Sequence, residues 1–160
     1  MKPFINLNDL EDFKESNNGP FQSKYATISE KIGAKKLGYN LSIVPPGKKV
    51  CPFHNHWVNE EMFLILEGSG ILRFGEEEYP IKENDIIACP PGGRDVAHQI
   101  VNTGTEDIKY LSLSTSEPYE ICEYPDSNKI LSVAGKEGRR EISHISKFES
   151  AVDYFDGEEK

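Results

Sequence analysis

The stretch GKKVCPFHNHWVNEEMFLILEG, residues 47–68, says more about the fold than any other part of this sequence. His54 and His56 stand two positions apart, and Glu61 follows five positions after His56. Residues i and i+2 of an extended segment project to the same side, so both imidazoles can face one point. Glu61 also opens the apolar run of residues 61–66, which indicates a strand buried on both faces.

A second stretch, NDIIACPPGGRDVAHQIVN at residues 84–102, supplies His98. Three of the chain's four histidines therefore fall within the two stretches, whereas His144 lies outside them and is expected on the surface. Three imidazoles and one carboxylate suit a divalent metal of the first transition row. The alternative, four polar residues at strand ends with ordinary hydrogen bonds, explains this concentration of histidines less well.

Together the two stretches resemble the two motifs of the cupin superfamily. The first motif is a glycine, then His-x-His, then Glu after three or four residues and Gly after six more. The second is Gly, five residues, Pro-x-Gly, then His, three residues and Asn. The resemblance covers residues 37–115, and the 15 residues between Gly68 and Asn84 are similar in number to those of compact microbial cupins. Activities in the group of single-domain cupins that this chain resembles are largely unassigned.

The sequence departs from the cupin pattern at three places. Six residues instead of five separate Gly47 from His54, a difference that a turn can absorb. Asn84 replaces the opening glycine of the second motif, and asparagine tolerates a positive φ better than most residues. Residues 93–97 lengthen the step from Gly92 to His98, while the Pro-Gly before them and Asn102 after His98 keep the local register.

The resemblance implies an all-β fold, a double-stranded β-helix or jelly-roll barrel, with four metal ligands inside its mouth: His54, His56, Glu61 and His98. Glu60 is a rival for the carboxylate position, but the six-residue step to Gly68 favours Glu61. Four protein ligands would fill a tetrahedral zinc shell. In an octahedral shell the same four leave two positions for substrate, water or O2, so the expected cofactor is one Fe, Mn, Ni or Zn ion.

The 160 residues and 18.0 kDa predict one structural domain with three parts. Residues 1–36 form an N-terminal arm with strands and a short helix that begins at Asn8. Residues 37–115 form the barrel core, with strands expected at 37–43, 61–66, 71–74, 77–81, 85–89, 98–102 and 108–115. Residues 116–160 form an extension with strands and an amphipathic helix from Ser146 to Phe155, whose apolar residues recur with helical spacing.

Composition excludes several classes of partner. The formal charge of −9 and a pI near 5.0 argue against binding to nucleic acid or to anionic membranes. No apolar run is long enough for a membrane span, and the first residues lack the pattern of a signal peptide. Three cysteines without a CxxC pair indicate a reducing compartment, so a cytoplasmic location is expected. No P-loop, dinucleotide-binding glycine motif or nucleophile elbow is present.

Two functions remain open at this level. The first is a metal-dependent enzyme, an oxygenase or an isomerase or lyase, acting on a small molecule beside Phe63, Ile65, Ile100 and Arg94. The apolar members of this set share strand parity with Glu61 or His98 and are as consistent with a plain core as with a pocket. The second is a non-catalytic protein that binds or senses a small molecule or the metal. A third possibility is a metal that only stabilises the barrel. Separately from these functions, the sequence is expected to form a homodimer.

Overall fold

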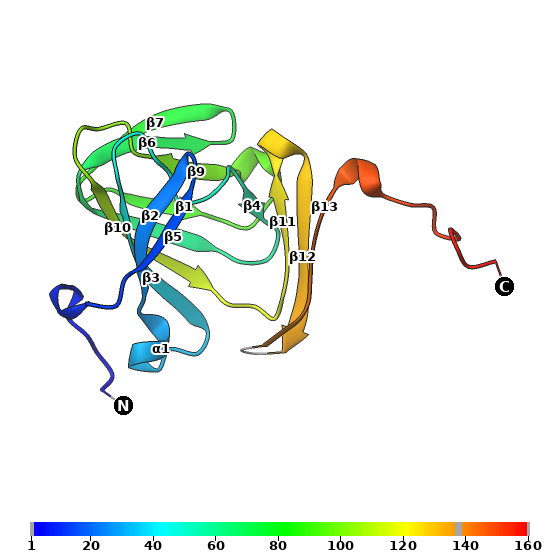
Figure 1. Cartoon of the computed structure of the whole chain (residues 1–160), viewed down its shortest axis with the longest axis horizontal. Helices are drawn as coiled ribbons and strands as arrows, with labels where there is room; N and C mark the ends of the chain where they lie inside the picture. The colour runs from blue at the N-terminus through cyan, green and yellow to red at the C-terminus, as the bar shows by residue number, and fades with distance from the viewer. Residues whose placement is uncertain (1, 137–138, 160) are drawn as a thin grey trace.

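The computed structural model describes residues 2–136 and 139–159, and strands account for most of them (Figure 1). The one α-helix among these residues is α1 (Ser29–Ile32), and the 3-10 turns are η1 (Leu7–Asp9), η2 (Arg94–Val96), η3 (Pro125–Ser127) and η4 (Phe148–Ser150). The strands are β1 (Lys14–Asn18), β2 (Phe21–Thr27), β3 (Leu37–Val44), β4 (Asn55–His56), β5 (Glu61–Glu67), β6 (Ser69–Phe74), β7 (Glu77–Lys82), β8 (Ile86–Cys89), β9 (His98–Val101), β10 (Ile108–Thr115), β11 (Tyr119–Tyr124), β12 (Lys129–Lys136) and β13 (Arg139–Lys147).

The strands form antiparallel sheets that enclose one apolar core. One sheet has the order β1-β2-β3-β10-β5-β8, a second the order β7-β6-β9, and a third the order β13-β12-β11-β4. The first and second sheets face each other as the walls of a barrel, because the strands of both supply its buried core. The core residues are Val44, Phe63, Ile65, Leu72, Ile81, Ile87, Cys89, Ile100, Ile108 and Tyr110. This arrangement confirms the predicted all-β double-stranded β-helix.

The N-terminal arm extends the six-stranded sheet with β1 and β2, and apolar residues of the arm pack on the outer face of that sheet. Leu10, Ala26 and Ile28 form a second buried cluster with Leu41, which lies on the opposite face of β3 from the barrel-facing Val44. Successive side chains of a strand point to opposite faces, so β3 serves the barrel core and the arm cluster at once. Residues of the arm therefore pack against the barrel.

The sequence predicts the seven central strands to within two residues at each end. Asn84 adopts a φ of 72°, which confirms that it fills the place of the motif's glycine. The inserted residues 93–97 form η2 without displacing His98, because the backbones of His98 and His54 bond to each other in both directions, at 2.7 and 3.2 Å.

Both predicted terminal helices are wrong. At the N-terminus the structure has only the three residues of η1, capped by Asn6 and not by Asn8. At the C-terminus, β13 continues to Lys147, and only η4 follows before an irregular tail that leads away from the body of the protein (Figure 1). Val152 and Phe155 are largely exposed, so this part of the expected apolar stripe is left unburied. Short helices without such packing are marginal in water.

The strand β13 forms an open edge of its sheet, and most of its side chains are exposed. Ile142 and Ile145 are among the exposed apolar residues of this strand. The homodimer expected from the sequence stays a prediction, with this edge as a surface available to a second copy. Among the described residues, none of the helices is both long and apolar enough to cross a membrane.

Asn102 offers a test of how the second motif stabilises the fold. Its fully buried side chain donates to the carbonyl oxygens of Val44 and Glu106 at 2.7 and 2.8 Å and accepts from the N–H of Gly104 at 2.9 Å. Asn102→Ala leaves those groups unpaired, so we predict that it lowers the free energy of unfolding by about 2 to 4 kcal/mol in urea titrations. The exposed control Asn17→Ala should cost less than about 0.5 kcal/mol, and equal losses in both variants would contradict the prediction.

Candidate metal centre

Three strand ends and one isolated bridge bring the predicted ligands together at one end of the barrel. Glu61 begins β5 and His98 begins β9, while His56 ends the short β4, which pairs with β11. His54 precedes β4 and forms the backbone bridge to His98. The fully buried side chain of Asn55, between the two histidines, donates to the carbonyl oxygen of Gly92 at 2.8 Å and anchors this segment to the second motif.

The three imidazoles converge on a single carboxylate oxygen. The Nε2 atoms of His98, His56 and His54 lie 3.0, 3.5 and 3.8 Å from Oε2 of Glu61. Ligands that each lie about 2.1 Å from one ion are about 3.0 to 3.4 Å apart when their bonds meet at right or tetrahedral angles. The distances from His98 and His56 to Glu61 are therefore close to those within a metal shell, and that from His54 is somewhat longer. The ligand atoms of His54, Glu61 and His98 all lie within 4.8 Å of one another. Glu60, the rival for the carboxylate position, is exposed and outside the cluster.

The other ring nitrogen of each histidine faces a hydrogen-bond acceptor. Nδ1 of His54 lies 2.9 Å from the carbonyl oxygen of Pro52, and Nδ1 of His98 lies 3.2 Å from that of Val96. Nδ1 of His56 lies 3.3 Å from Oε2 of Glu120. A proton on Nδ1 leaves the lone pair on Nε2 for a metal. Nε2 of His56 is buried and has no hydrogen-bond partner among the described residues, as a metal-binding nitrogen would.

Burial and charge set the protonation of the cluster. Burial and the neighbouring His98 lower the pKa of His54 to about 4, which keeps its imidazole neutral. Burial alone would lower the pKa of His56, but its bonds with Cys122, Glu120 and Glu61 outweigh burial and raise the value to about 12. Burial likewise opposes ionisation of Glu61, yet hydrogen bonds with His56 and His98 hold its pKa below the usual range. In the metal-free cluster the protonated ring of His56 therefore balances the carboxylate of Glu61. A divalent metal would take the place of the proton on His56 Nε2.

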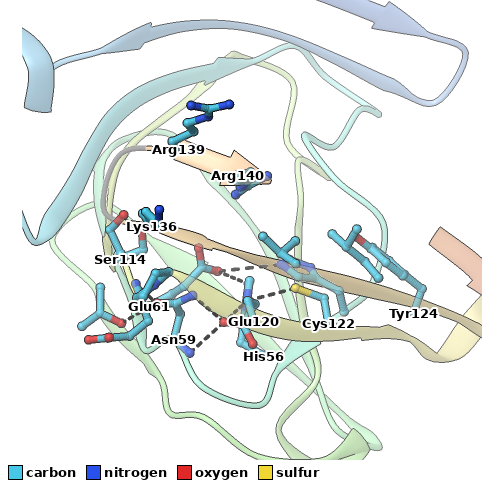
Figure 2. A pocket seen from close by; sticks show the side chains of 17 residues that line it. His56, Asn59, Glu61, Ser114, Glu120, Cys122, Tyr124, Lys136, Arg139 and Arg140 are labelled. Carbon is cyan, nitrogen blue, oxygen red and sulfur yellow. Dashed lines mark hydrogen bonds and ion pairs between the residues drawn. The ribbon is translucent and has the colours of Figure 1, made fainter. Parts of the chain in front are cut away.

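Glu120 is a residue of the candidate site that sequence analysis missed. Its side chain on β11 is buried and accepts hydrogen bonds from the backbone N–H groups of residues 57–59 and of Ile121, at 2.8 to 3.1 Å. It thereby holds the loop between His56 and Glu61 and orients the ring of His56. Burial opposes its ionisation, but the bonds with His56 and with the backbone of Asn59 lower the pKa of Glu120 to about 2. Figure 2 shows Glu120 between the loop and the histidine.

The sulfur of Cys122 lies on the same side of His56 as Glu120. Its Sγ atom is 3.2 Å from Nδ1 of His56, so these three residues also form a compact group of possible ligands. Nε2 of His56, in contrast, faces Glu61. Glu120 and Cys122 therefore lie behind the imidazole of His56, where they support the ring.

Burial raises the pKa of the Cys51 and Cys89 thiols to about 12, which keeps both neutral and unreactive.

The site opens into a cavity of about 560 Å³ between the barrel and the β11–β13 strands (Figure 2). His54, His56 and Glu61 line this cavity together with Tyr124. The opposite wall carries basic residues of the β12–β13 hairpin: Lys136, Arg139 and Arg140. A volume of this size is typical of sites that take small molecules.

The substrate-pocket residues predicted from the sequence lie outside the cavity lining. Phe63 is buried with its ring 5.8 Å from that of His98, whereas Ile65 and Ile100 belong to the barrel core. Arg94 forms an ion pair with Glu123 at 2.8 Å and a hydrogen bond with Asn128, which fastens η2 to the third sheet. Apart from His54, His56, Asn59 and Glu61, the residues that line the cavity fall within 114–136 and at Arg139 and Arg140, where the sequence carries no ligand-binding motif.

Comparison with known proteins agrees with the fold. The family model described as "Cupin domain" matches residues 40–114. Auxin-binding protein 1 of Arabidopsis thaliana is 30% identical over 131 residues, which cover 75% of this chain and 64% of that protein. The chain thus spans less than two thirds of the length of this relative.

Solved structures extend the likeness to almost the whole chain. A protein of Acidithiobacillus ferrooxidans, proposed to be a sugar phosphate isomerase, superposes with a TM-score of 0.82 at 22% identity, over 95% of this chain and 96% of its own. A sugar phosphate isomerase of Silicibacter pomeroyi gives 0.77 at 22% identity, over 96% and 98%. At this identity the likeness shows the fold. With the two motifs, the barrel and these matches in agreement, the chain belongs to the cupin superfamily.

Proposed function

We propose that this protein is a metal-dependent isomerase or lyase that acts on a small metabolite in its cavity. One divalent first-row ion would be held by His54, His56, Glu61 and His98. The observation that carries the proposal is the convergence of three Nε2 atoms on Oε2 of Glu61 beside a cavity of about 560 Å³. The names of the two similar solved structures support the isomerase class.

The residues around the cavity have separable tasks in this proposal. When bound, a divalent ion would polarise a carbonyl or hydroxyl oxygen of the substrate. Glu61 supplies the negative charge that holds the ion, and the hydrogen bonds of the Nδ1 atoms keep the imidazoles aimed at it. Tyr124 lines the cavity with its ring 6.2 Å from that of His54. Burial raises the pKa of Tyr124 to about 12, so its phenol keeps its proton and donates to a substrate oxygen.

A non-catalytic ligand-binding protein is the second candidate. It is favoured by the name of the relative auxin-binding protein 1, which refers to binding and not to a reaction. The two candidates differ in whether a bound sugar derivative is converted, since both use the same cavity.

Turnover assays with Glu61→Gln test the enzyme directly. A panel of aldose and ketose phosphates should contain a substrate that the metal-loaded protein converts. We predict that Glu61→Gln and removal of the metal each lower kcat/KM at least about 100-fold, because the amide no longer balances the charge of the ion. Glu60→Gln is the matched control and should retain activity within about threefold. Undiminished turnover by the metal-free protein would contradict the proposal, and binding without conversion with any metal would favour the second candidate.

The variant Glu120→Gln tests whether β11 of the third sheet supports metal binding by orienting the ring of His56. We predict that Glu120→Gln weakens metal affinity about 10- to 100-fold in competition with a chromogenic chelator, because the amide holds the ring of His56 less firmly. Glu123→Gln is the matched control, since Glu123 is also buried on β11 but bonds to Trp57 and Arg94. Its metal affinity should stay within about threefold of the wild type. Equal affinities of the Glu120 variant and the wild type would show that His56 needs no such support.

A further inference from the structure

The arginines of this acidic chain fall into two kinds. Arg73 forms two bonds with the carboxylate of Asp126, at 2.9 and 3.1 Å, and Arg94 pairs with Glu123 at 2.8 Å. Arg139 and Arg140 have no carboxylate within 4.0 Å among the described residues, although acidic residues outnumber basic ones 27 to 18. Both line the cavity. Two such guanidinium groups beside a metal centre are suited to bind an anion.

An irregularity in the β12–β13 hairpin places these cations. The register of the two strands shifts between Ala134 and Gly135, so that Ala134 pairs with Ile142 and Gly135 with Arg140. A Cβ atom on Gly135 would lie 2.1 Å from the backbone oxygen of Arg139, so only glycine permits this close approach. Bulges of this kind redirect side chains near functional sites. Here the cavity is lined by Arg139 and Arg140 although they are consecutive, and Figure 2 shows both on the side of the cavity away from His56.

The charges around the cavity leave an excess of positive charge on this wall. Glu61 belongs to the candidate metal ligands, and Glu120 is held by backbone N–H groups and His56. Glu117 is the remaining acidic side chain that lines the cavity, and Glu141 approaches Lys136 only at 4.0 Å. Lys136, Arg139 and Arg140 therefore outweigh the acidic groups on their own side, before any charge of the metal is added.

We propose that Lys136, Arg139 and Arg140 form a phosphate-binding rim that recognises the phosphate of a phosphorylated sugar. This inference rests on the proposed function, in which the other end of the same molecule lies at the metal centre. A phosphate monoester carries close to two negative charges at neutral pH and offers oxygen atoms to the planar fork of arginine. The rim then selects phosphorylated over neutral sugars, while the histidines and Glu61 act on the far end.

Binding of a substrate analogue tests the rim without turnover. The probe is a hexitol monophosphate, which has no carbonyl group to isomerise, compared by calorimetry with the same hexitol without phosphate. We expect the metal-loaded wild type to prefer the phosphorylated probe at least about tenfold. The double variant R139Q/R140Q should lose about ten- to a hundredfold of affinity for that probe, because two charge-assisted contacts are removed. The matched control K14Q/K82Q removes two exposed lysines that do not line the cavity and should bind like the wild type.

Further arms separate the possible failures. Both arginines are exposed, so their replacement should leave the metal content and the unfolding midpoint of R139Q/R140Q unchanged. The proposed rim is contradicted if R139Q/R140Q binds the phosphorylated probe as tightly as the wild type does. It is also contradicted if this variant loses affinity only for the matching sugar acid, which carries a carboxylate instead of a phosphate. If the wild type holds no metal but its metal-free form still shows the arginine-dependent preference, the rim stands and the proposed metal function fails.

Discussion

One carboxylate oxygen, Oε2 of Glu61, lies within 3.8 Å of three imidazole nitrogens that come from two distant parts of the chain. A buried carboxylate without compensating charge is costly, so this contact needs a cation or protons nearby. In the metal-free protein the protonated ring of His56 meets that need. Each of the three rings is held from behind, by two backbone carbonyls and the carboxylate of Glu120. Much of the geometry of the barrel mouth follows from this requirement.

The third sheet links the candidate metal centre to the rest of the cavity. Its strand β11 carries Glu120, which holds the loop after His56, and Glu123, which accepts from the indole of Trp57 at 2.8 Å. The adjoining β12–β13 hairpin supplies the basic wall. The same sheet therefore orients the candidate ligand His56 and also lines the cavity. In the proposed function, a change in this sheet would affect both metal affinity and ligand selection.

The central strands were accessible from the sequence because local spacing and periodicity encode them. The turn at Asn84 and the meeting of the four predicted ligands followed instead from the resemblance to the two cupin motifs. The positive φ of Asn84 needed only knowledge of which residues tolerate that conformation. Glu120 was not accessible, since it lies more than 60 residues from the loop it holds, and its only sequence mark is a place on an alternating strand. The prediction of a C-terminal helix was wrong because the periodicity is real but Val152 and Phe155 stay exposed, and a short helix without packing is marginal in water.

Elemental analysis of protein purified without chelator or histidine tag, beside His98→Ala, tests the central claim most directly. His98 is almost fully buried and lies closest to Glu61 among the three histidines, so its replacement should lower the metal content. The account predicts about one divalent ion per wild-type chain after dialysis and a sharp reduction in the variant. A wild type that retains no ion after exposure to iron, manganese, nickel and zinc would contradict it, and the barrel would then bind its ligand by other means.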